Sequence, residues 1–241
     1  MPPCIARVAC LALVLVAGPV LAGDLANFNT AVEAAQSHNR VAIGYLRTGN
    51  VDLASLEIDR LRESWRTLQE RFASERPDAF DGVELYGMLW TGVSARLVAA
   101  DLMLKIGRAD AARQSLDGIS GDLYALRKAA GVTVLADCIR DANTVMGGLM
   151  IYNDRDLDWT KSETRFGIAS KASIYNYVLD RCDGMADTSL RKSPEFRRLI
   201  DGAKAGLALI PKAIATRDSD LLHRVLIELR SFDNLLAFRF G

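Results

Sequence analysis

The chain has 241 residues, of which 50% are hydrophobic and 25% are charged, and its 30 basic residues balance its 30 acidic ones. This composition excludes an intrinsically disordered chain, which is poor in apolar residues and rich in unbalanced charge. The zero net charge argues against a nucleic-acid-binding protein, because such proteins need an excess of basic residues. We therefore expect a soluble globular protein that is large enough to bury a core.

The first 22 residues have the features of a secretory signal peptide. Arg7 is their only charged residue, the apolar run Val8–Ala17 follows it, and Val20-Leu21-Ala22 offers short residues at the positions that signal peptidase reads. The run is shorter than the ~20 apolar residues that span a membrane, and we find no second stretch of that length. We predict a signal peptide at residues 1–22 and export to the bacterial periplasm, with an uncleaved N-terminal anchor as the alternative.

After residue 22, apolar residues recur at helical spacing almost throughout, and strand-like alternation is absent. This pattern predicts an all-α fold of about eight helices, paired as four antiparallel hairpins in a helical bundle or a short solenoid. We expect a single all-helical domain over residues 23–241, which can divide into halves 23–131 and 132–241. The expected helices cover residues 28–46, 52–73, 86–107, 110–131, 134–153, 163–181, 194–216, and 219 to near the C-terminus.

The seventh expected helix carries the clearest boundary signals. Ser193 is suited to the N-cap, Pro194 to the first helical position, and Glu195 places an acidic residue in the first turn. Pro211 lies inside the expected helix, where its ring clashes with the preceding turn. We therefore expect this helix to begin at Pro194 and to be disturbed near Pro211.

Two of the turns between helices share a sequence pattern. They resemble the Gly-to-Ala turn of tetratricopeptide-type helical hairpins, over about ten residues each. The resemblance implies only a helical hairpin with a small residue where two helices cross, because the two aspartates lie 58 residues apart instead of the ~34 of that repeat family. A third turn, at residues 214–222, lacks the glycine and the small residue. The two turns read Leu46-x-x-Gly49-x-x-Asp52-x-Ala54 and Leu104-x-x-Gly107-x-x-Asp110-x-Ala112.

Two cysteines, Cys138 and Cys182, follow the predicted signal peptide. They lie near the start of the fifth expected helix and at the end of the sixth, and their midpoint falls in the polar loop 154–162. Residues equidistant from the turn of an antiparallel hairpin lie side by side, so we predict a disulfide between them. A redox-active or copper-binding pair is the alternative, although CxxC spacing is absent.

Several polar residues fall in line with, or border, the apolar faces of the expected helices: Asn39, Asp101, Asn143 and Asp233. A buried carboxylate must be paired or protonated, because an unpaired one costs several kcal/mol. Arg230 lies one turn before Asp233 and joins it beside an apolar stripe. These five residues are our candidates for binding a small ligand in a polar pocket between hairpins. The alternative is that they form structural ion pairs that fix the register of the helices.

The mature chain offers few groups that bind a metal or haem. His38 lies at the edge of its apolar helical face, whereas His223 lies away from the apolar face of its helix and is expected to be exposed. Met146 and Met150 lie four residues apart on one helical face and are possible copper ligands, although methionine at this spacing more often fills a core. Haem or copper binding through these residues is therefore the alternative hypothesis.

No motif of a zinc site, a c-type haem, a serine hydrolase, a P-loop or a dinucleotide-binding fold occurs in the chain. An enzyme using Asp101 or Asp233 as acid or base lacks any further motif in its support. We expect no cofactor, no catalysis, no nucleic-acid partner and no transmembrane segment in the mature chain. The predicted function is an exported, non-enzymatic helical binding module for a partner protein or small ligand, and the alternative is a haem- or metal-binding bundle for electron transfer or metal handling.

Overall fold

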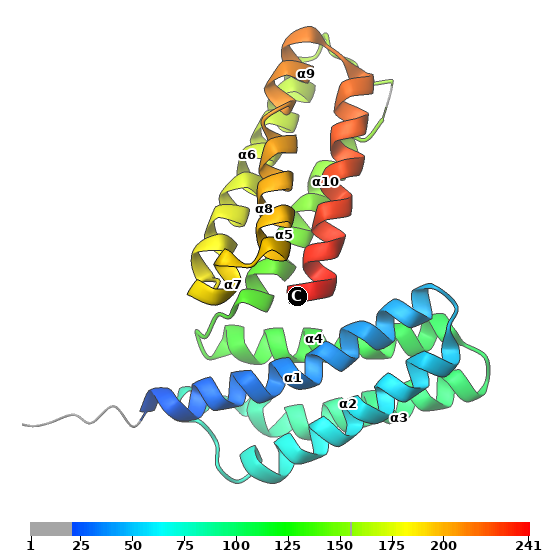
Figure 1. Ribbon diagram of the computed structural model, residues 1–241, viewed down its shortest axis with the longest axis vertical. Helices are drawn as coiled ribbons and strands as arrows, with labels where there is room; N and C mark the ends of the chain where they lie inside the picture. Colours follow the sequence, from blue (N-terminus) through cyan, green and yellow to red (C-terminus); the bar gives the residue numbers. More distant parts are fainter. Residues whose placement is uncertain (1–20, 155) are drawn as a thin grey trace, which may run out of the picture.

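A computed structural model describes residues 21–154 and 156–241, and within these ranges the chain is helical and has no strand (Figure 1). This confirms the all-α prediction. Most of the predicted signal peptide lies outside the described residues. The helices are α1 (Leu21–Arg47), α2 (Val51–Phe72), η1 (Asp78–Phe80), α3 (Glu84–Lys105), α4 (Ala109–Ala129), α5 (Leu135–Leu149), η2 (Met150–Tyr152), α6 (Ser162–Met185), α7 (Thr188–Lys192), α8 (Pro194–Leu207), α9 (Ile210–Thr216) and α10 (Ser219–Phe240).

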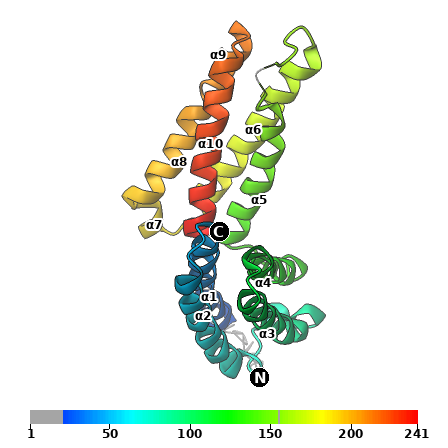
Figure 2. The ribbon, with the colours of Figure 1, turned by 90° about the vertical axis from the view of Figure 1, so that its right-hand side faces the viewer.

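The buried apolar residues form two separate clusters. One runs from Phe28 to Leu126 and joins α1–α4, which we name the N-terminal bundle. The other runs from Cys138 to Leu236 and joins α5, α6, α8, α9 and α10, which we name the C-terminal bundle. The helices of one bundle run across those of the other, and the two meet where α10 ends near α1 (Figures 1 and 2). Each half of the described chain therefore has its own core.

Two glycines allow the chain to reverse direction in the turns of the N-terminal bundle. Gly49 and Gly107 adopt positive φ angles of 76° and 73°, a backbone conformation that costs glycine little. The small residues after these turns, Ala54 and Ala112, are fully buried where neighbouring helices approach. The third turn of this pattern places Arg217 in the left-handed region, with φ 54°, where a side chain makes the conformation unfavourable.

The C-terminal bundle combines the α5–α6 hairpin with α8, α9 and α10. The expected seventh helix begins at Pro194 as predicted, with Ser193 accepting a hydrogen bond from the Phe196 amide. It ends at Leu207, and α9 then starts with Pro211 in its first turn, where the missing amide hydrogen does not matter. The predicted disturbance near Pro211 is therefore a break into two helices. The sequence analysis missed α7, a helix of 5 residues capped by Asp187.

The two cysteines meet as their spacing predicts. Cys138 and Cys182 form a disulfide with their Cα atoms 5.5 Å apart, and both residues are fully buried. The bond joins the start of α5 to the end of α6, so it ties the open end of this hairpin. The predicted disulfide is confirmed.

One described helix, α3, is long and apolar enough to cross a membrane by length and composition. The sequence analysis did not recognise it as a candidate. One side of α3, including Tyr86, Trp90, Val93 and Leu97, is buried in the N-terminal bundle. The central helix of a packed bundle passes the same test, so this composition alone does not place α3 in a membrane.

Candidate ligand-binding cavity between the two bundles

A cavity of about 250 Å³ lies where α1 and α4 of the N-terminal bundle meet α5 and α10 of the C-terminal bundle. Figure 2 shows this junction, with the end of α10 next to α1. Each helix contributes residues spaced three or four apart, which is the spacing of one helical face. On α1 these are Gln36, Arg40, Ile43 and Arg47, which extend over about 16 Å at the ordinary helical rise. The cavity is therefore a space of mixed polar and apolar lining between two independent cores.

A buried ion pair forms one wall of this cavity. Arg127 on α4 donates to both carboxylate oxygens of Asp137 on α5, with Nε–Oδ2 and Nη2–Oδ1 distances of 2.8 and 2.6 Å. Both side chains are 6% exposed. Asp137 also accepts a hydrogen bond from the Val134 amide at the start of α5. The pair thus holds the linker between the bundles and sets the position of both helices.

Arg40 lies at the junction of α1 with the end of α10. Its guanidinium donates to Glu33 at 2.5 Å and to the main-chain oxygen of Gly241 at 2.7 Å. Arg40 is 8% exposed, so its charge is held in place by these partners rather than by bulk water. The contact fastens the C-terminal bundle to α1.

A small amide cluster lies between α1 and α4. Asn39 is fully buried and its Nδ2 donates to the main-chain oxygen of Leu116 at 3.1 Å, which fixes the orientation of this amide. The same Nδ2 and the hydroxyl of Ser120 both donate to Oε1 of Gln36. The Oε1 of Gln36 must therefore face them, and its Nε2 is left buried with no hydrogen-bond partner among the described residues. The sequence predicted Asn39 as a buried polar residue but missed Gln36.

Three of the predicted site residues come together on the C-terminal side. Asp233 is 1% exposed, and its Oδ2 accepts hydrogen bonds from Asn143 at 2.6 Å and Arg230 at 3.1 Å. Its Oδ1 accepts a hydrogen bond from the hydroxyl of Tyr175 at 3.2 Å, a partner that the sequence did not indicate. Asn143 and Arg230 line the cavity, and Asp233 lies behind them.

Burial raises the pKa of Asp233 to about 6, although Arg230, Asn143 and Tyr175 oppose this rise. The folded protein therefore binds this proton more tightly than the unfolded chain does, and Asp233 makes the fold less stable as pH rises from about 4 to above 6. Relative to Asp233→Asn, the wild type should lose about 3 kcal/mol of unfolding free energy between pH 3.5 and 7.5, at 1.36 kcal/mol per pKa unit. Urea denaturation of both proteins across this range measures the difference. A constant difference would show that Asp233 titrates normally.

Asp101 does not belong to this cavity, and its predicted burial is wrong. Its side chain is 37% exposed and pairs with Arg62 of α2 on the surface of the N-terminal bundle. The apolar stripe of α3 is narrower than the sequence pattern suggested, so Asp101 falls on its flank. This is the structural ion pair that the sequence analysis gave as the alternative.

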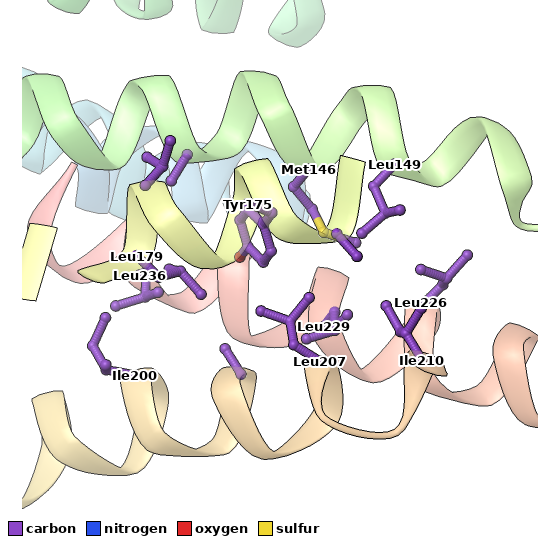
Figure 3. Packing of buried hydrophobic residues seen from close by; sticks show 14 of the residues in the cluster. Met146, Leu149, Tyr175, Leu179, Ile200, Leu207, Ile210, Leu226, Leu229 and Leu236 are labelled. Carbon is purple, nitrogen blue, oxygen red and sulfur yellow. The ribbon is translucent and has the colours of Figure 1, made fainter. Parts of the chain in front are cut away.

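The candidate metal and haem residues lie apart. His38 Nδ1 is 2.7 Å from Glu57 Oε2 in the N-terminal bundle, whereas Met146 is fully buried in the core of the C-terminal bundle (Figure 3). Met150 packs at the edge of the same core. His223 is half-buried rather than exposed as expected, with a buried Nδ1. In the described part of the chain, no group of three or more His, Cys, Asp or Glu residues is placed to hold a metal ion.

In its described residues the protein is all-helical, with two bundles and a cavity of mixed lining, including five arginines, at their junction. The chain matches no protein family model, no curated protein and no solved structure.

Proposed function

We propose that this protein is an exported, non-catalytic binding protein that holds a small ligand in the cavity between its two bundles. The cavity itself carries the proposal, because its mixed lining of apolar and polar side chains resembles that of small-molecule sites, and its volume of about 250 Å³, just below the roughly 300–1,000 Å³ of such sites, suits a small ligand. Export rests on the signal-peptide features of residues 1–22.

The polar side chains around the cavity support binding by a preformed site. Arg127 is fixed by Asp137, Arg40 by Glu33, and Arg230 by Asp233. Side chains that are already held need little reordering when a ligand arrives, which favours affinity. Because the lining comes from both bundles, a bound ligand would also stabilise their association.

The test is to purify the mature protein and identify small molecules that it retains by native mass spectrometry and by mass spectrometry of the denatured extract. Ala136 lines the cavity, so Ala136→Phe should fill part of it and abolish retention. Ala125→Phe makes the same change on the exposed side of α4 and should leave retention intact. Equal retention by both variants, or no ligand after incubation with a periplasmic metabolite extract, would contradict the proposal.

A further inference from the structure

We infer that the ligand of this cavity is a small anion that carries a carboxylate or phosphate group. This inference rests on the proposed function, since it concerns the same cavity. The cavity is lined by five arginines and two aspartates. The lining therefore carries more positive than negative charge, although the whole chain is neutral.

The existing ion pairs do not neutralise this excess. Three arginines are each engaged by a carboxylate, as described above, and Asp117 accepts a hydrogen bond from Arg113 of the same helix at 3.1 Å. In contrast, neither Arg47 nor Arg140 has a carboxylate of the described residues within 4.0 Å. The guanidinium of Arg140 lies 5.2 Å from the centre of the Tyr124 ring, a contact that leaves its hydrogen-bond donors free.

Arg47 and Arg140 come from different bundles, at the end of α1 and in the first half of α5. Both are exposed, so they lie at the rim of the cavity, where a ligand can reach them from solvent. A guanidinium group offers a planar fork of N–H donors that fits the two oxygens of a carboxylate or phosphate. Two such groups facing one cavity favour an anion over a neutral or cationic ligand.

Gln36 supplies a second and independent indication. It lines the same cavity, it is 6% exposed, and its Nε2 is a buried donor without a partner among the described residues. A buried donor that is left unpaired is unfavourable, and a ligand oxygen that reaches Nε2 from the cavity would remove that cost. The unpartnered Oδ1 of Asn39 next to Gln36 is an acceptor, but Asn39 does not line the cavity. The free groups of the residues that do line it are hydrogen-bond donors, and they favour a ligand with acceptor oxygens.

The test is isothermal titration calorimetry of the mature protein at low ionic strength. Succinate and inorganic phosphate are the probes, and succinamide is the uncharged analogue of succinate. We expect at least one anion to bind with one site per chain and succinamide not to bind. The double variant Arg47→Gln/Arg140→Gln should weaken anion binding by about tenfold or more, because it removes both charged donors from the rim of the cavity. Arg224→Gln, an exposed arginine of α10 outside the cavity, is the matched control and should change binding by less than about twofold.

Three results would overturn the inference. One is binding of neither anion, and another is equal binding of succinate and succinamide. The third is an affinity for anions that is unchanged in the double variant while the circular dichroism and melting temperature show it to be folded. If neutral molecules bind and Ala136→Phe blocks them, the anion inference fails while the proposed function stands.

Discussion

Replacing Asp137 with alanine should lower the free energy of unfolding by about 3–5 kcal/mol, the largest loss that we expect from a single polar substitution. The reason is that Arg127 would remain buried without its carboxylate, since both side chains are 6% exposed in the native pair. The substitution also removes the acceptor for the Val134 amide at the start of α5. Urea denaturation followed by circular dichroism measures the loss.

Asp141 provides the matched control for this experiment. It lies one turn further along α5 and pairs with Arg181, but its side chain is 36% exposed, so Asp141→Ala should cost only roughly 1 kcal/mol. The double variant Arg127→Met/Asp137→Leu should recover most of the loss, because removing both charges leaves neither uncompensated. Equal losses for Asp137→Ala and Asp141→Ala would contradict the burial of the Arg127–Asp137 pair.

Removing the disulfide should cost about 4 kcal/mol, through replacement of Cys138 and Cys182 with serine or through reduction. The bond closes a loop between cysteines that are 44 positions apart, and opening it increases the conformational freedom of the unfolded C-terminal bundle. Amide hydrogen exchange should therefore accelerate in α5 and α6 and remain unchanged in the α1–α2 hairpin, which belongs to the other core.

A thiol count provides the check on this expectation. The unfolded, unreduced protein without residues 1–22 should have no free thiol, and two free thiols per chain would refute the bond. Uniform acceleration of exchange in both bundles would instead show that they unfold as one unit.

The sequence predicted the helices well because each helix buries one stripe of apolar side chains. Such a stripe appears in the sequence as apolar residues at helical spacing. The disulfide could also be predicted from the sequence, since Cys138 and Cys182 are equidistant from a loop. Asp101 was misplaced because periodicity locates the centre of an apolar face better than its edge. The sequence analysis allowed a division into residues 23–131 and 132–241, which falls between the two cores. The way in which the two bundles cross depends on which stripes face each other, and no local pattern contains that information.

Only part of the candidate cavity could be predicted. Asn143, Arg230 and Asp233 were found because polar residues beside an apolar stripe need partners. Gln36 and the Arg127–Asp137 pair were missed, because their importance comes from the crossing of two bundles and not from their own helices. One signal was available for Asp137: an acidic residue in the first turn of a helix is suited to bind the free amides there.

The hydrogen bond between Arg40 and Gly241 joins residues 201 positions apart in the chain. The two bundles are thus connected by the covalent linker after α4, which the Arg127–Asp137 pair reinforces, and by this contact, so that the chain between α1 and the end of α10 forms a closed ring. A protein with this topology cannot open its cavity by swinging about the linker alone, because the second connection must first be released. We expect the cavity to be completed late in folding, because its lining joins residues that are far apart in the chain.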